Sequence, residues 1–255
     1  MGSPATNLPS SRRAARKGGL CYCAFTQYES RTGNSPRCRV ASQALPSSSS
    51  YFVSDVLTRH LSCMRFLAIS GSLRSQSTNT SLLRALTKLA PPELEIVIYE
   101  GLDQIPPFNP EKEADTLSGP VAQFRTALEE AAAVLFSTPE YAHGLPGTLK
   151  NALDWVVGSG ELSRKPVVLM NASSRGTYAQ ASLKEILVTM DAKLLQEAEV
   201  TIDILGKNYT PTEIAQNPEF SSVLSASLRC VVEACVQEQT KRDQAGSLVQ
   251  SATEN

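Results

Sequence analysis

The sequence predicts a doubly wound α/β domain, in which helices cover both faces of a parallel sheet. Downstream of Met64, short apolar runs alternate with amphipathic segments of helical length. The apolar runs are rich in Val, Ile and Leu, which is typical of parallel strands buried on both faces. The chain has 255 residues, 42% of them hydrophobic, and is therefore long enough to bury a sizeable core.

Five strands and five helices are expected in alternation. The first strand ends in a turn rich in Ser and Gly, after which four leucines, Leu82, Leu83, Leu86 and Leu89, fall on one helical face. The expected strands are residues 65–69, 95–99, 133–137, 166–170 and 200–205. The expected helices are residues 79–89, 121–132, 147–157, 181–190 and 218–238.

The first 63 residues differ in composition from the rest. They hold eight Lys and Arg against Glu29 and Asp55, a net charge of +6, which leaves −7 for the remaining residues because the whole chain carries −1. They also hold 12 serines and show no sustained apolar periodicity. Residues 1–63 are therefore predicted to be a disordered basic leader, ahead of a domain at 64–240 and a frayed polar tail at 241–255.

Three explanations of the leader remain open. Its Arg-rich, Ser-rich and acid-poor composition is that of an organellar transit peptide. It is equally compatible with an upstream extension of a domain that begins at Met64. The first residues also match the N-myristoylation pattern by chance, with Gly2 as the acceptor. The expected location is cytoplasmic, or organellar if the leader is a transit peptide.

Composition argues against several function classes. A net charge of −1 gives no overall attraction to nucleic acid, and no stretch reaches the roughly 18 to 20 apolar residues that span a membrane. The six cysteines include no CxxC pair, so neither a metal site nor an iron-sulfur cluster is expected. Cys230 and Cys235 are interpreted as small apolar residues of a helix in a reducing compartment.

The loop after the first strand, residues 70–80, is rich in hydroxyl side chains and holds one arginine, Arg74. It lacks both GxGxxG and GxxxxGK[ST], which removes the sequence support for a dinucleotide or Walker site. In doubly wound folds, ligands bind at the carboxyl ends of the strands, and a helix N-terminus attracts anions. The loop therefore favours a mononucleotide phosphate site, with a merely capped loop as the alternative.

The loop after the third strand places two prolines and two glycines close together, beside an aromatic residue, in PEYAHGLPGTLKNALDW. Together with GSLRSQSTN, this segment resembles the NADPH-dependent FMN reductase family of flavodoxin-like quinone, chromate and azo-type reductases. The resemblance covers about residues 64–238. It implies a five-stranded parallel sheet in the order 2-1-3-4-5.

The resemblance also implies cofactor contacts in three loops. In the family, the first loop holds the FMN phosphate, the Pro-Glu-Tyr loop lies along the isoalloxazine, and a short Ser/Gly loop lies beside the ring. The matching residues are Ser72, Arg74, Ser77, Thr78 and Asn79; then Pro139, Glu140, Tyr141 and Ala142; then Ser173, Arg175 and Gly176. Many members carry Asn where this chain has Ala142, which puts one side-chain contact in doubt.

The implied reaction is passage of hydride from NADPH or NADH through FMN to a small acceptor such as a quinone, by ping-pong exchange. No catalytic residue is assigned, because the cofactor carries the chemistry. Arg175 is expected to stabilise charge on the reduced ring. The alternatives are a flavodoxin-type electron carrier and a non-catalytic nucleotide-binding module.

The resemblance further implies a homodimer or homotetramer. Leu149, Leu153 and Trp155 are expected to pack in the core, with a subunit interface as the alternative for Trp155. His143 has no evident partner in the sequence, so a loop or subunit contact is favoured over a role as a general acid.

Overall fold

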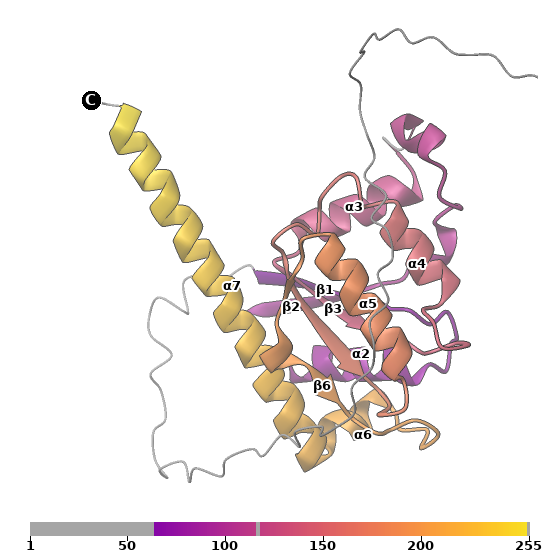
Figure 1. Ribbon diagram of the computed structural model, residues 1–255. Coiled ribbons are helices and arrows are strands. Elements are labelled where there is room, and N and C mark those ends of the chain that lie inside the picture. The colour runs from indigo at the N-terminus through magenta and orange to yellow at the C-terminus, as the bar shows by residue number, and fades with distance from the viewer. Residues whose placement is uncertain (1–63, 116–117, 254–255) are drawn as a thin grey trace, which may run out of the picture. The chain divides into compact units, whose positions relative to one another are not determined.

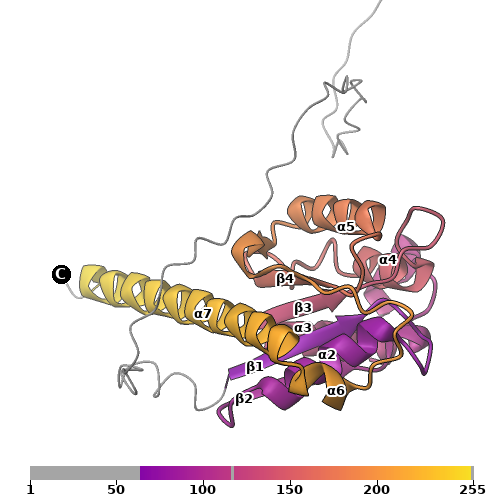
Figure 2. The same cartoon turned by 90° about the horizontal axis from the view of Figure 1, so that it is seen from below.

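The computed structural model describes residues 64–115 and 118–253, drawn as coloured ribbons in Figures 1 and 2. The predicted leader, residues 1–63, lies outside the described residues, so its alternatives stay predictions. The described residues form a parallel sheet with helices on both faces, which confirms the predicted fold class.

The sheet has the order β2-β1-β3-β4-β5, and every pair of neighbouring strands is parallel. This order confirms the one that the family resemblance implied. The strands are β1 (Met64–Ser70), β2 (Leu94–Tyr99), β3 (Ala133–Ser137), β4 (Pro166–Asn171), β5 (Lys193–Leu194) and β6 (Val200–Thr201).

The edge beyond β4 differs from the prediction of a single strand at 200–205. Both β5 and β6 pair with successive parts of β4, and the 3₁₀ turn η3 (Gln196–Ala198) separates them. Beyond β6, the N–H groups of Ile202 and Ile204 donate to the carbonyls of Asn171 and Ala172. The segment thus runs beside the end of β4, although only its first two residues form a strand.

The helices broadly follow the prediction. They are α2 (Thr78–Leu89), α3 (Pro120–Glu130), α4 (Gly147–Asp154), α5 (Thr177–Thr189), α6 (Pro211–Gln216) and α7 (Pro218–Thr253). Two further 3₁₀ turns, η1 (Leu102–Gln104) and η2 (Pro110–Asp115), lie between β2 and α3. Helix α5 begins four residues before the predicted start at residue 181, because the chain turns into the helix directly after Gly176.

Two helical segments depart from the sequence prediction. Helix α6 was not predicted, although Thr210 and Glu213 form a reciprocal capping box around Pro211 at the first helical position. Helix α7 continues to Thr253, whereas the prediction ended it at Glu238. No proline interrupts the chain after Pro218, so nothing in the backbone forces the earlier end.

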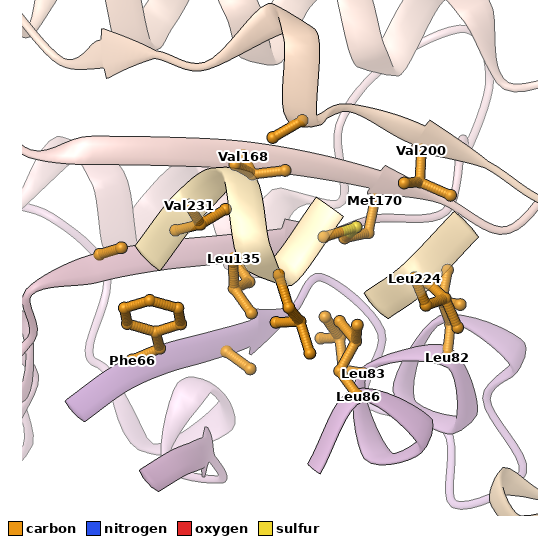
Figure 3. Packing of buried hydrophobic residues seen from close by; sticks show 14 of the residues in the cluster. Phe66, Leu82, Leu83, Leu86, Leu135, Val168, Met170, Val200, Leu224 and Val231 are labelled. Atoms are coloured by element: carbon orange, nitrogen blue, oxygen red, sulfur yellow. The ribbon is translucent and has the colours of Figure 1, made fainter. Parts of the chain in front are cut away.

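Each face of the sheet packs against its own set of helices. On one face, Phe66, Leu135 and Val168 of the strands meet leucines of α2 and the apolar side of α7, as Figure 3 shows. On the other face, alternate residues of the same strands, such as Leu67 and Val134, meet α3, α4 and α5. This alternation arises because successive strand side chains point to opposite faces.

Trp155 belongs to the second face and is 1% exposed, with its Nε1 donating to the carbonyl of Pro106 at 2.8 Å. The structure therefore buries Trp155 within its own chain, and the alternative of a subunit contact is wrong for this side chain. Cys235 is buried and Cys230 half-buried, as expected of small apolar residues, and both are free thiols. Burial raises the pKa of the Cys235 thiol to about 12.

Candidate functional site

Three loops meet at the carboxyl ends of β1, β3 and β4 and enclose a cleft of about 410 Å³, here called the strand-end cleft. This is the position at which doubly wound folds bind ligands, and the volume lies within the usual range for small-molecule sites. Its lining residues are Ser72, Arg74, Ser77, Thr78, Asn79, Thr138, Pro139, Glu140, Tyr141, Asn171, Ala172, Ser173, Arg175, Gly176 and Leu205.

The first loop is held in shape by its own hydroxyl groups. The Oγ of Ser70 accepts from the backbone N–H of Ser72 at 3.3 Å and from the hydroxyl of Thr80 at 2.8 Å. Ser77 caps α2, since its Oγ accepts from the N–H of Thr80 at 3.3 Å. The first turn of α2 carries no acidic residue, so the N–H groups before Thr80 and the positive dipole end are available to an anion.

Arg74 adds a full positive charge beside this helix end. Its side chain is exposed and lines the cleft, and it makes no ion pair within residues 64–115 and 118–253. Asn79 is committed differently, because its Oδ1 accepts from the buried hydroxyl of Ser137 at 2.9 Å. The side chain of Asn79 therefore fixes α2 to the end of β3.

The first and second loops touch at Gly71. Its N–H donates to the carbonyl of Ser137 at 2.9 Å. A Cβ added to Gly71 would lie 2.3 Å from Oγ1 of Thr138 and 3.1 Å from Cδ2 of Leu149. Only glycine permits this close approach of the two strand ends.

The second loop folds back on itself. Tyr141 and Gly144 exchange two backbone hydrogen bonds, of 3.1 Å and 3.0 Å, and the two residues between them have left-handed φ angles, 49° at Ala142 and 59° at His143. The N–H of Tyr141 is therefore used within the loop. The ring of His143 stacks on Tyr178 of α5, with centroids 4.3 Å apart, which agrees with the expected loop contact.

The carboxylate of Glu140 reaches across to α5. Its Oε2 accepts from the backbone N–H of Tyr178 at 2.8 Å and from that of Ala179 at 3.0 Å. The family resemblance implies that the loop of Glu140 lies along the ring, but it gives no role for the carboxylate. The contact spans 38 residues of sequence, so no local pattern predicts it.

The third loop is built from short side chains that hold the backbone. The Oδ1 of Asn171 accepts from the N–H of Ser173 at 3.1 Å, and the Oγ of Ser173 accepts from the N–H of Arg175 at 3.2 Å. Asp203 binds the N–H of Ser174 at 2.5 Å, and this hydrogen bond lowers the pKa of the Asp203 carboxyl. The same segment brings Leu205, which is half-exposed, to the cleft.

The structure brings eleven of the twelve predicted site residues into the cleft lining. Ala142 is the exception, and it lies between Tyr141 and Gly144, which pair with each other where the loop folds back. Four lining residues were not predicted: Thr138, Asn171, Ala172 and Leu205. Three of them immediately end a strand or follow it, and this position is a signal that could have found them. Leu205 was expected to end the strand at 200–205, so the same signal applied to it.

A second cavity, of about 580 Å³, is larger than the strand-end cleft but is less suited to chemistry. Prolines and aromatic side chains around Phe108 and Trp155 line it, and Lys112 is the one charged residue among its described lining. Asn151 of α4 bonds to the loop that forms this cavity, accepting from the N–H of Phe108 at 2.7 Å. We therefore place the candidate site in the strand-end cleft, where donors and a cation converge.

The described part of the chain shows neither a cluster of metal-ligating side chains nor a membrane-spanning helix. Within it, no three or more His, Cys, Asp or Glu side chains are grouped so that they could hold a metal ion. None of its helices has the length and apolar character needed to cross a membrane.

Comparison with known proteins agrees with this geometry. The family model described as NADPH-dependent FMN reductase matches residues 64–205, which include every strand and all three loops. The chain is 38% identical over 144 residues to an NAD(P)H-dependent FMN reductase of Pseudomonas aeruginosa, a match that covers 54% of this chain and 77% of the relative. It is 35% identical over 147 residues to an NADPH:quinone oxidoreductase of Arabidopsis thaliana, covering 55% and 74% of the two chains.

A solved structure supports the same relationship. The flavoenzyme NAD(P)H:(acceptor) oxidoreductase FerB from Paracoccus denitrificans matches with a TM-score of 0.61 at 26% identity, over 69% of this chain and 98% of that one. The fold, the matched loops and these identities agree with one another. The chain therefore belongs to the NADPH-dependent FMN reductase family.

Proposed function

We propose that this chain is an NAD(P)H-dependent reductase that carries FMN in the strand-end cleft and reduces a small acceptor such as a quinone. The observation that carries the proposal is the convergence of the three family loops on one cleft that has a cationic helix end. The names of the relatives, an FMN reductase and a quinone oxidoreductase, support the choice of cofactor and acceptor class.

The α2 end of the cleft fits the FMN phosphate. Arg74 supplies charge, the first turn of α2 supplies N–H donors, and the hydroxyls of Ser72 and Ser77 can donate as well. The Oγ atoms of these two serines already accept backbone hydrogen bonds, but the O–H groups keep their donor capacity. Thr78 and Asn79 lie at the same end and complete the proposed phosphate contacts.

The middle of the cleft fits a flat ring. The second loop contributes Pro139 and Tyr141 to the lining, and the third loop and the segment after β6 contribute Ser173, Gly176 and Leu205. Because the N–H of Tyr141 donates within its own loop, we assign the polar contact from the second loop to the backbone N–H of Glu140. Ala142 is proposed to shape the loop, and its position outside the lining argues against a direct contact.

FMN supplies the redox chemistry when bound, because it accepts hydride from NAD(P)H and passes it to the acceptor. The protein positions the reactants. Tyr141 and Leu205 are each half-exposed, so they form a rim where nicotinamide and acceptor bind in turn. Arg175 also lines the cleft, and its positive charge is proposed to stabilise the negative charge that develops on the ring during reduction.

The test starts with an absorbance spectrum of the purified full-length protein. We expect a flavin spectrum, or uptake of added FMN, followed by bleaching on anaerobic addition of NADPH and recovery on addition of a quinone. A protein that binds FMN but oxidises NAD(P)H only through a partner reductase would be an electron carrier instead. A colourless protein that takes up no FMN would contradict the proposal.

Initial rates then test the order of binding. If both substrates use the same rim in turn, rate plots at several quinone concentrations should give parallel lines. Intersecting lines would indicate a ternary complex with separate sites and would contradict the exchange proposed here. A comparison of NADPH and NADH in the same assay gives the preferred donor. We also propose a homodimer or homotetramer, on the family resemblance alone.

A further inference from the structure

Two helices begin at the strand-end cleft, α2 after β1 and α5 after β4. A helix N-terminus carries partial positive charge and N–H groups without partners inside the helix. Both ends would therefore attract an anion. A ligand with one phosphate could then enter the cleft in either of two directions.

The α5 end lacks a cap of its own. The helix has 13 residues, its N-cap is Gly176, which provides no side-chain hydrogen bond, and its first turn holds no acidic residue. Glu140 supplies the missing anion from the second loop, with Oε2 at 2.8 Å and 3.0 Å from the N–H groups of Tyr178 and Ala179. These are the donors that an incoming phosphate would need.

A second contact joins the same two segments. The ring of His143 stacks on that of Tyr178, with an angle of 8° between the planes. The loop that carries Glu140 is thus attached to α5 at two points, and its carboxylate is held over the helix end. Beside it, Asp203 lies close enough to Lys207 and Arg175 for their charges to interact. Of the carboxylates at the α5 end, Glu140 is the one that occupies the N–H groups of the helix.

The α2 end is capped differently. Its cap is the neutral Ser77, its first turn holds no acidic residue, and Arg74 lies beside it with no ion pair among the described residues. A carboxylate of the chain thus covers the N-terminus of α5, whereas a neutral hydroxyl caps that of α2.

We infer that Glu140 determines the orientation of the ligand, acting as an internal anion that closes the α5 end to phosphate. FMN then enters with its phosphate at α2 and its ring toward α5. This inference rests on the proposed function for the identity of the ligand. The closure of the α5 end is a property of the protein alone, and it can be measured without flavin chemistry.

The probe is inorganic phosphate, titrated calorimetrically into the full-length protein. The variants are Glu140→Ala, Glu140→Ala with Arg175→Ala, and Glu185→Ala as a control. Glu185 is an exposed residue within α5, so the control makes the same charge change on the same helix away from its N-terminus.

We expect Glu140→Ala to bind one phosphate more than the wild type. Any FMN that copurifies is removed by dialysis before the titration, because its ring would cover the α5 end. The test therefore concerns the protein without FMN, and a failure of the FMN proposal leaves it intact. Adding Arg175→Ala should weaken the gained phosphate by at least about tenfold, since it removes a charge-assisted contact. The control should bind as the wild type does. A merely structural role of Glu140 would not create an anion site that depends on Arg175.

The inference is overturned if folded Glu140→Ala gains no phosphate, if the gained site is insensitive to Arg175→Ala, or if Glu185→Ala gains one as well. Circular dichroism checks the fold. If Glu140→Ala does not fold, Glu140→Ser takes its place with the same expectation, because the shorter side chain is neutral and does not reach the two N–H groups. If neither variant folds, the carboxylate serves folding rather than orientation, and the inference fails.

Discussion

The helices at the two ends of the strand-end cleft are capped in different ways. Ser77 caps α2 from within its own turn, three residues from the N–H that it binds. Glu140 caps α5 from another loop, 38 residues away in sequence. The local cap leaves α2 open to an anion, whereas the distant cap fills α5 with a charge. Helix ends that look alike in sequence can thus differ in function, because tertiary contacts decide which of them stays available.

The largest effect is expected where the first two loops touch. Gly71→Ala would place a Cβ 2.3 Å from Oγ1 of Thr138, a buried β-branched residue that has little freedom to move. We expect the free energy of unfolding to fall by about 2 to 3 kcal/mol, in the upper part of the range for overpacking. Urea unfolding of wild type and Gly71→Ala measures this change in the free energy of unfolding.

The double variant Gly71→Ala with Thr138→Ala is the control for this prediction. It removes the clashing oxygen, so part of the lost stability should return and the two changes should be non-additive. Additive losses would show that the close approach of the two strand ends does not limit the choice of residue at Gly71.

A smaller effect is expected at the α2 cap. Ser77→Ala removes the hydroxyl that binds the N–H of Thr80, and loss of such a cap costs about 1 kcal/mol in the free energy of unfolding. Ser77→Asp should keep the cap but place a negative charge where the phosphate is proposed to bind. It should therefore retain stability while losing FMN affinity, as measured by fluorescence titration. Equal FMN affinity in wild type and Ser77→Asp would place the phosphate elsewhere.

The smallest effect is expected at the rim of the second loop. Ala142 has a φ of 49°, a left-handed conformation that costs most side chains about 1 to 2 kcal/mol and that Asn adopts more easily. Ala142→Asn should therefore raise the free energy of unfolding by up to about 1 kcal/mol. Ala142→Val should lower it, because a β-branched residue suits this conformation least. A melting temperature that rises with Val or falls with Asn would contradict this account.

Much of the fold could be predicted because its signals are local. The spacing of its leucines identified α2, and the short apolar runs identified β1 to β4. The sheet edge beyond β4 was harder to predict, since β5 and β6 have two residues each, which is too short for a recognisable apolar pattern. Helix α6 could have been found, because Thr210 and Glu213 form a capping box that is readable in the sequence.

In the candidate site, too, residues with local sequence signals could be predicted, whereas residues placed by distant contacts could not. Residues that follow a strand, such as Arg74 and Tyr141, could be placed in the cleft from the strand–loop–helix order and the family resemblance. Leu205 was expected at the end of a strand and also reaches the cleft, although the segment before it pairs with Asn171 and Ala172 without forming a full strand. The side chain of Glu140 could not be placed, since its partners are backbone N–H groups that have no signature in the sequence.

The most direct test of the asymmetric cleft is the affinity for FMN and for riboflavin, measured by fluorescence titration of wild type, Arg74→Ala and Arg175→Ala. Riboflavin has the same ring but no phosphate, so the difference between the two ligands reports the phosphate contact alone. If the phosphate lies at α2, Arg74→Ala should lose about 10- to 150-fold in FMN affinity, the equivalent of 1.5 to 3 kcal/mol, with little change for riboflavin. Arg175→Ala should leave the ratio of the two affinities nearly unchanged. Equal loss of FMN and riboflavin binding in Arg74→Ala, or a collapse of the ratio in Arg175→Ala instead, would contradict the account.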